Sequence, residues 1–206
     1  MGGAVPEIIR LAGDDTDDAA IARATEVLAG GGLVAFPTDT VYGLGADASR
    51  PDAVERLYEA KGRDRSKRVA VLVPDADSAA RLAEAWPALA GRLAEEYWPG
   101  ALTIVAGGRG FRVPANAAAR ALASGILGAT GGGLAATSAN RSGGPDPRTA
   151  REVVEALGGS VDLVLDGGEA GGVPSTVVRV SGTRLEVLRE GAIPAAELEA
   201  LARGGG

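Results

Sequence analysis

Short apolar runs typical of buried strands alternate with segments of helical periodicity along almost the whole chain. This alternation restricts the fold more than any other feature. Strands are expected over residues 32–36, 69–73, 101–106, 111–113, 133–137 and 161–165. Helices are expected over residues 17–29, 51–60, 76–85, 87–97, 115–123, 149–157 and 194–203. Helices and strands mixed in this way predict an α/β fold.

Two further expected strands near the C-terminus form a hairpin pattern. Residues 175–180 and 184–189 flank Ser181-Gly182-Thr183, a sequence that favours a tight turn. The strands of a hairpin run antiparallel, so the sheet is expected to be mixed rather than wholly parallel.

Length and composition favour one folded domain. The 206 residues are 46% hydrophobic and 23% charged, which suits a chain that buries a sizeable core. With no evident linker, we expect a single domain over residues 1–206, with a core at about 14–203 and a frayed tail at 204–206. No apolar stretch approaches the ~20 residues of a membrane helix. The N-terminus also lacks the layout of a signal peptide, so a cytoplasmic location without membrane contact is expected.

The chain contains no histidine and no cysteine. Their absence excludes a Ser-His-Asp triad, a cysteine nucleophile and an ordinary zinc site, and we expect no metal ligated by the protein. Any catalysis must rest on cationic, hydroxyl, carboxylate and backbone groups. Such groups suit charge stabilisation around phosphates better than proton-shuttling hydrolysis.

Two loops in the first third of the chain gather polar side chains. Residues 36–45 follow a strand and supply two hydroxyls, a carboxylate and a phenol, although Pro37-Thr38-Asp39 is also ordinary turn chemistry. Residues 61–68 hold five cations in a chain of net charge −6. Lys61 and Arg63 would share one face of an extended segment and could clamp a polyphosphate. A solvated loop explains the same run.

Two later loops are also candidates. Residues 137–144 place hydroxyl and amide groups at the end of a strand, where they can hold a ligand or form a turn. Arg189 shares parity with Leu185 and Val187, so it is expected to point toward the apolar side. There it would need an anion or an internal carboxylate partner.

Taken together and in this order, the loops resemble the YrdC/Sua5 family of threonylcarbamoyl-adenylate synthases. The resemblance covers about residues 30–193 and rests on seven segments: residues 37–45, Lys61-Gly62-Arg63, residues 98–103, Arg112-Val113-Pro114, residues 137–143, residues 175–178 and residues 189–193.

The resemblance implies an open, twisted, mixed α/β sheet with flanking helices and a concave basic cavity. It implies a nucleotidyltransferase that joins L-threonine, bicarbonate and ATP, accompanied by Mg²⁺, into threonylcarbamoyl-adenylate and releases pyrophosphate. Other proteins of a tRNA-modification pathway would then transfer the threonylcarbamoyl group, and RNA could contact the basic cavity. The resemblance leads us to expect the family's short form, without a second domain after Ile193.

The matching positions imply a role for each site residue. Lys61 and Arg63 match catalytic positions that bind phosphate. The threonine pocket is implied for Thr38, Arg112, Ala136 and Ser175. Nucleotide binding is implied for Lys61, Arg63, Lys67, Ser138, Asn140, Asp146 and Arg189.

Some positions depart from the family's pattern: Asp64, Lys67, Arg68, Leu72, Asn116 and Glu190. Leu72 stands where long-form members often carry a histidine that contacts threonine. Two other interpretations therefore stay open. One is a non-catalytic paralogue that binds RNA or a nucleotide. The other is a carbamoyl-transfer module of the kind found in longer hydrogenase-maturation proteins.

Overall fold

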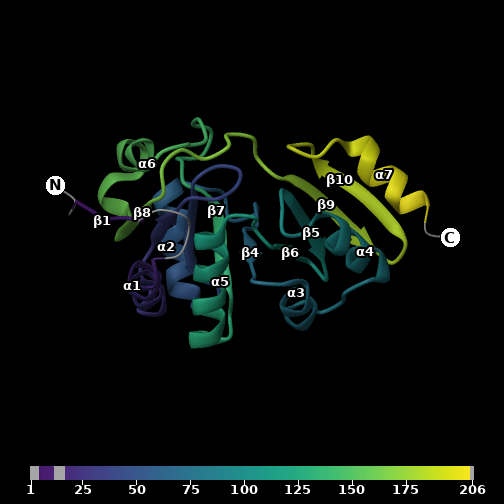
Figure 1. Ribbon diagram of the computed structural model, residues 1–206, viewed down its shortest axis with the longest axis horizontal. Coiled ribbons are helices and arrows are strands. Elements are labelled where there is room, and N and C mark those ends of the chain that lie inside the picture. Colours follow the sequence, from purple (N-terminus) through teal and green to yellow (C-terminus); the bar gives the residue numbers. More distant parts are fainter. Residues whose placement is uncertain (1–4, 12–16, 205–206) are drawn as a thin grey trace.

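A computed structural model describes residues 5–11 and 17–204 of the chain. These residues build one ten-stranded sheet with the order β1-β8-β2-β3-β7-β4-β6-β5-β9-β10 (Figure 1). Parallel and antiparallel pairs both occur, as the sequence predicts for a mixed α/β sheet. The expected start of the core at residues 14–16 and the end of the expected tail at 205–206 lie outside the described residues.

The strands are short and follow the predicted pattern with two additions. Their bounds are β1 (Glu7–Arg10), β2 (Val34–Phe36), β3 (Gly43–Asp47), β4 (Ala70–Leu72), β5 (Leu102–Ala106), β6 (Arg109–Arg112), β7 (Leu134–Ser138), β8 (Leu163–Asp166), β9 (Thr176–Ser181) and β10 (Arg184–Arg189). The sequence pattern did not predict β1 or β3, and β3 falls within the loop expected over residues 36–45. The β9–β10 hairpin is confirmed by its antiparallel ladder.

Each helix lies where the sequence predicts one, with shifted ends. The helices are α1 (Asp18–Ala29), α2 (Pro51–Lys61), α3 (Ala76–Leu82), α4 (Ala88–Tyr97), α5 (Ala117–Thr130), α6 (Ala150–Leu157) and α7 (Ala195–Arg203), and a 3₁₀ turn, η1 (Gly158–Ser160), follows α6. The largest difference is in α5, which continues past Gly125 to Thr130. At Gly125 a Cβ atom would lie 2.5 Å from Thr25 Oγ1, so this glycine permits close packing of α5 against α1.

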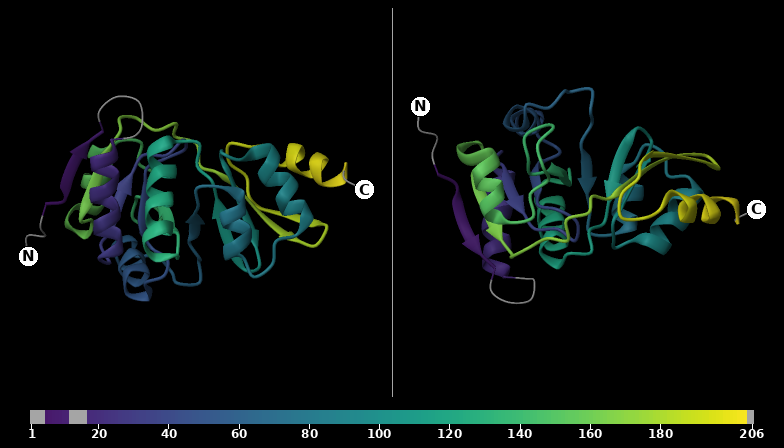
Figure 2. Two further views of the ribbon diagram at one scale, coloured as in Figure 1. Left: turned by 60° about the horizontal axis from the view of Figure 1, so that its bottom comes forward. Right: turned by 90° about the horizontal axis from the view of Figure 1, so that it is seen from above.

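The helices cover the two halves of the sheet differently (Figures 1 and 2). In the half that contains β2 and β3, α1 and α5 share one apolar cluster with Phe36, while α2 and α6 share another with Leu44. In the half that contains β5 and β9, α4 and α7 pack on Ile104 and Val178. Among the described residues, the buried apolar clusters cover only this face of β5 and β9. The candidate site lies on the opposite face of these two strands.

The connection between β8 and β9 crosses from one half of the molecule to the other (Figures 1 and 2). Tyr42 holds its start, because the Tyr42 hydroxyl donates to Gly168 O at 2.7 Å and accepts from Gly167 N at 3.2 Å. Burial raises the pKa of Tyr42 to about 12, so the hydroxyl keeps its proton and stays a donor.

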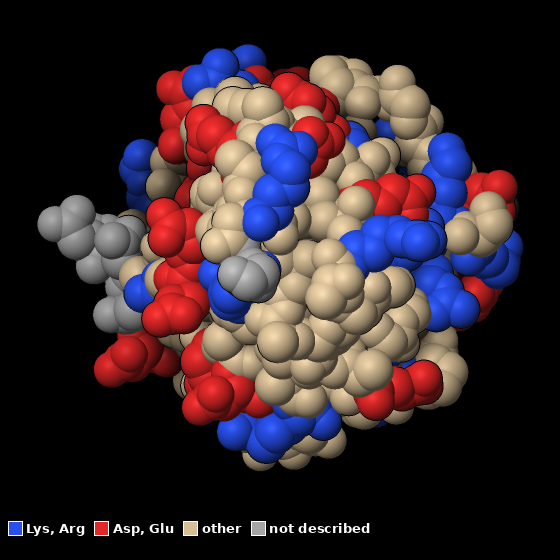
Figure 3. All heavy atoms as spheres, turned by 90° about the vertical axis from the view of Figure 1, so that its right-hand side faces the viewer, with Lys and Arg blue, Asp and Glu red and all other residues tan. Residues whose placement is uncertain are grey.

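Charge is mixed on the end of the molecule nearest α7. In Figure 3 acidic and basic side chains are interspersed around an uncharged area on that face. Among the helices of the described residues, none combines the length and the hydropathy needed to cross a lipid bilayer.

Candidate active site

A cavity of about 640 Å³ lies on the face of the sheet that α4 and α7 leave open. Strands β4, β5, β6 and β9 contribute alternate residues to its wall: Ala70 and Leu72, Thr103 and Val105, Gly110 and Arg112, and Val177 and Arg179. The residues between them, such as Phe111, Ile104 and Val178, belong to the apolar clusters on the opposite face. The two-residue period of a strand therefore separates a core face from a ligand-accessible face.

Small residues on neighbouring strands leave room for the cavity. Ala70 pairs with Gly110 in the β4–β6 ladder and with Ala136 in the β4–β7 ladder. A Cβ atom on Gly110 would lie no closer than 3.5 Å to any neighbour, so this position opens into the cavity.

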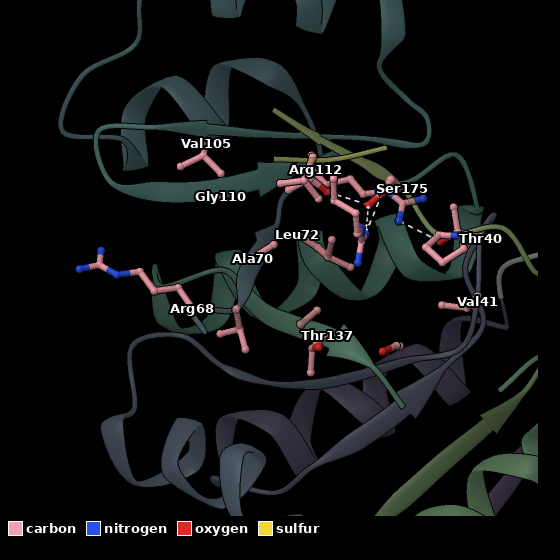
Figure 4. A pocket seen from close by; sticks show the side chains of 18 of the residues that line it. Thr40, Val41, Arg68, Ala70, Leu72, Val105, Gly110, Arg112, Thr137 and Ser175 are labelled. Atoms are coloured by element: carbon pink, nitrogen blue, oxygen red, sulfur yellow. Dashed lines mark hydrogen bonds between the residues drawn. The ribbon is translucent and has the colours of Figure 1, made fainter. Parts of the chain in front are cut away.

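Arg112 is the most buried cation of the cavity wall, with 7% of its surface exposed. Its Nη2 donates to Asp39 Oδ2 at 2.7 Å, its Nη1 to Thr40 Oγ1 at 2.9 Å, and its Nε to Gly100 O at 2.9 Å. Burial lowers the pKa of Arg112, and Asp39 opposes that shift. The guanidinium is therefore held in one orientation, and Figure 4 shows it beside Ser175.

The other residues predicted for threonine lie around Arg112. Thr38, Ala136 and Ser175 are all buried, and all line the cavity. The Thr38 hydroxyl donates to Val41 O at 2.7 Å and lies 2.9 Å from Thr40 Oγ1. The four residues predicted for the threonine pocket thus line the same cavity.

Lys61 occupies a different position from the one its spacing predicts. Helix α2 ends at Lys61, and Gly62 adopts a left-handed conformation (φ 57°), so residues 61–63 are not an extended segment. Lys61 is only 2% exposed. Its Nζ donates to Asn140 O at 2.6 Å, to Asn140 Oδ1 at 2.8 Å and to Ser138 O. The expectation that Lys61 and Arg63 share one face is therefore wrong.

The bonds of Lys61 tie α2 to the loop that follows β7. The hydroxyl of Ser138, the last residue of β7, donates to Asn140 Oδ1 at 2.7 Å, and in the loop Asn140 Nδ2 donates to Gly144 O at 2.7 Å. Burial and the nearby Arg63 lower the pKa of Lys61 to about 8, and Asp146 acts against them. Among these residues Ser138, Asp146 and Arg63 line the cavity, whereas the buried Lys61 and Asn140 are not part of the lining.

Arg63 and Lys67 also differ in their placement. Arg63 lines the cavity, and its Nε donates to Lys67 O at 2.9 Å. The exposed Lys67 is not part of the cavity lining, so the structure does not bring it to the predicted nucleotide site. Arg68 lies at the opposite end of the cavity from Arg112 and Thr40 (Figure 4).

Arg189 does not point toward the apolar side, contrary to its parity with Leu185 and Val187. The β9–β10 register shifts between Val187 and Arg189, and this irregularity reverses the side on which Arg189 lies. Arg189 is exposed and lines the cavity, and its Nη2 donates to Ser175 O at 2.7 Å. No ion pair of Arg189 with a carboxylate occurs among the described residues.

Arginines outnumber carboxylates in the cavity lining, and two of them, Arg112 and Arg179, form ion pairs with Asp39 and Glu186. Asp146 is the acidic residue of the lining, and the cations are Arg63, Arg68, Arg112, Arg179 and Arg189. Guanidinium groups on several sides of a cavity suit a ligand that carries phosphates or carboxylates.

Three polar residues of the site were missed by the sequence reasoning: Asp39, Thr40 and Thr103. Asp39 and Thr40 stand in the first candidate loop beside Thr38, but the partner that they share, Arg112, is 73 and 72 residues away. Thr103 stands in the segment over residues 98–103 and is one of the alternate residues of β5. Whether the Thr103 side chain faces the cavity or the core could not be predicted until the core face of β5 was known.

Comparison with known proteins gives consistent results. Residues 26–191 match the Sua5_yciO_yrdC family, which is described as "Telomere recombination". The chain is 38% identical over 198 residues to a threonylcarbamoyl-AMP synthase of Bacillus subtilis, with 90% of this chain and 57% of that protein covered. The chain thus spans little more than half the length of that relative.

Two solved structures share the fold. The crystal structure of P. abyssi Sua5 complexed with L-threonine has a TM-score of 0.83 and 34% identity, and the match covers 96% of this chain and 61% of that chain. The crystal structure of E. coli YciO has a TM-score of 0.81 and 25% identity, with 92% and 97% covered. Sequence and structure agree over most of the chain, which therefore belongs to the Sua5/YciO/YrdC family.

Proposed function

We propose that this chain synthesises threonylcarbamoyl-adenylate from L-threonine, bicarbonate and ATP and releases pyrophosphate. The observation that carries the proposal is the pairing of two kinds of subsite in one cavity. Arg112, Thr38 and Ser175 form a buried polar pocket, and Arg63, Ser138 and Arg189 line the same cavity. The B. subtilis relative named threonylcarbamoyl-AMP synthase and the threonine complex of P. abyssi Sua5 support this assignment.

In the threonine pocket, Arg112 binds the substrate carboxylate. Asp39, Thr40 and Gly100 take three of the five N–H groups of its guanidinium, which leaves two for a ligand. Thr38 and Ser175 offer hydroxyls to the polar groups of threonine, and Ala136 keeps the pocket open. The buried, oriented guanidinium distinguishes this pocket from a solvated anion site.

In the nucleotide subsite, Arg63, Ser138 and Arg189 contact the phosphates. Lys61 and Asn140 hold the end of β7 that carries Ser138, and Asp146 completes the proposed set. Mg²⁺ accompanies the ATP in this proposal. The wall offers one carboxylate, Asp146, which suits an ion bound mainly by phosphates and water.

The proposed chemistry requires positioning more than proton transfer by the protein. The ammonium of threonine and bicarbonate give a carbamate, with loss of water and a proton. A carbamate oxygen then forms a bond to the α-phosphorus, the bond from that phosphorus to the bridging oxygen breaks, and pyrophosphate leaves. Arginine side chains around the phosphates neutralise the charge that builds up on the leaving group. This reaction needs neither histidine nor cysteine from the protein.

We also propose where the chain acts and what uses its product. The whole chain acts as one domain in the cytoplasm, and its product supplies other proteins that modify tRNA. RNA contact at the cavity mouth belongs to the same proposal, and Arg68 and Arg179 are the cations that would make it.

Pyrophosphate release from ATP and bicarbonate, with and without L-threonine, tests the function. Release that depends on threonine and falls strongly in Arg112→Lys is expected, because lysine cannot reproduce the fixed guanidinium fork. Folded protein that releases no pyrophosphate with threonine, yet binds RNA with steep salt dependence, would instead support the non-catalytic paralogue.

A further inference from the structure

Thr103 lies in the cavity between the two proposed subsites and has no role in either. It is 6% exposed and is the second residue of β5, with its side chain toward the cavity. Its hydroxyl lies 3.0 Å from the hydroxyl of Ser175, which is 7% exposed. Two buried hydroxyls in contact form a polar spot in a stretch of wall that Val105 and Val177 otherwise make apolar.

The strand registers place an arginine on each side of this hydroxyl pair. Ile104 pairs with Phe111, so Thr103 lies beside Arg112 across the β5–β6 ladder. On the other side Thr103 pairs with Val177, and Val177 pairs with Arg189. Arg189 Nη2 also lies 3.4 Å from Ser175 Oγ. One row across the sheet therefore runs from Arg112 through Thr103 and Val177 to Arg189.

Arg189 is a minor contributor to the lowered pKa of Arg112, because two guanidinium groups on the same face of the sheet repel each other. An anion between them would relieve that repulsion. The hydroxyl pair can both donate and accept hydrogen bonds, which suits a small oxyanion that still carries a proton.

We infer that Thr103 binds bicarbonate, with Ser175 at the border between this site and the threonine pocket and with Arg112 and Arg189 on either side. The inference rests on the proposed function, because the reacting carbon must lie between the threonine amine and the α-phosphate. Arg112 belongs to the threonine pocket and Arg189 to the nucleotide subsite, so the hydroxyl pair lies where that carbon has to be. Thr103 is thus a substrate-binding residue that fixes the third reactant.

Thr103→Val tests the inference, because valine keeps the β-branched shape and removes only the hydroxyl. We expect the KM for bicarbonate to rise about tenfold or more, as is usual when a hydrogen bond to a charged ligand is lost. The KM values for threonine and ATP should stay within about twofold of wild type. Thr103→Ser, which restores the hydroxyl, should recover the bicarbonate KM, and Thr103→Ala should repeat the effect of valine.

Val105→Thr is the matched control, since it adds a hydroxyl on the same strand and the same face two residues away. Its KM for bicarbonate should equal that of wild type. An unchanged bicarbonate KM in Thr103→Val would overturn the inference. An equal rise in the threonine or ATP KM would also overturn it, because the site would then serve a carboxylate or a phosphate.

A binding measurement separates this inference from the proposed function. Wild-type protein should broaden the ¹³C resonance of labelled bicarbonate, and Thr103→Val should broaden it much less, whether or not product forms. If wild type makes no threonylcarbamoyl-adenylate but shows this difference, the function fails and the anion site stands. Equal broadening by both proteins contradicts the site.

Discussion

At the scale of single residues, Asp39 determines how Arg112 can act. The Asp39 carboxylate accepts from Arg112 Nη2 at 2.7 Å and from Ala115 N at 3.1 Å, so it joins the first candidate loop to β6 and to the segment just before α5. A buried guanidinium needs such a partner. Asp39 is therefore a positioning residue that acts on the substrate through Arg112.

Asp39→Asn should lower the free energy of unfolding by about 1–3 kcal/mol, because the buried Arg112 loses its charged partner. It should also raise the KM for threonine, since the guanidinium is less well fixed. Urea unfolding and steady-state kinetics measure the two effects. Glu7→Gln is the control: its partner Arg23 is exposed, so its effect should stay below about 0.5 kcal/mol. Equal effects of the two variants would contradict the role of Asp39.

Lys61 should make stability depend on pH. Its pKa falls from about 10.5 in the unfolded chain to about 8 in the folded protein, chiefly through burial. Between those values the unfolded chain holds a proton that the folded protein has released, so the free energy of unfolding rises with pH. The contribution is at most about 3 kcal/mol.

In Lys61→Met this contribution should disappear. The difference in unfolding free energy between wild type and Lys61→Met, from urea titrations at several pH values from about 7 to 10, should therefore increase in favour of wild type. A difference that stays constant over this range would show that Lys61 keeps its ordinary pKa in the folded state.

At the scale of elements, helices were easier to predict than strands. The helical spacing of apolar residues extends over several turns and is therefore easy to recognise, and all seven α-helices of the described residues lie where it indicates. The predicted end of α5 at residue 123 was wrong, because packing against α1 keeps the helix intact past Gly125 and Gly128.

Gly125 and Gly128 provide a test of that packing. Gly125→Leu should destabilise the protein by about 1–3 kcal/mol, because its Cβ would meet Thr25 Oγ1 at 2.5 Å. Gly128→Ala should stabilise it by about 0.5–1 kcal/mol, because no heavy atom lies within 4 Å and alanine favours the helix. Thermal unfolding followed by circular dichroism measures both. Equal effects of the two substitutions would contradict the close α1–α5 contact.

Strand β3 was not predictable from its residues. All five residues of Gly43–Asp47 are buried, so no alternation of polar and apolar side chains marks it. Two of its residues are glycines, which usually disfavour strands. At Gly45 a Cβ would lie 2.8 Å from both Leu134 and Phe36, so close approach of neighbouring side chains explains that glycine.

At the scale of the whole molecule, the site depends on strand order, which local patterns do not specify. Strand β7 pairs with β3 on one side and β4 on the other, and this joins Ser138 and Ala136 to the wall that carries Leu72 and Arg112. The residue types alone identified the candidate loops. That these loops line one cavity follows only from the order of the strands in the sheet. The register shift in β10, which turns Arg189 into the cavity, also has no signal in the sequence.

The most direct measurement of the central claim is mass spectrometry of the product formed from ATP, L-threonine and bicarbonate. The account predicts the mass of threonylcarbamoyl-adenylate, and a shift by the mass of one neutron when ¹³C-bicarbonate replaces ordinary bicarbonate. The product should be absent when threonine is omitted. ATP consumption by folded protein without this labelled product would contradict the proposed function of the cavity.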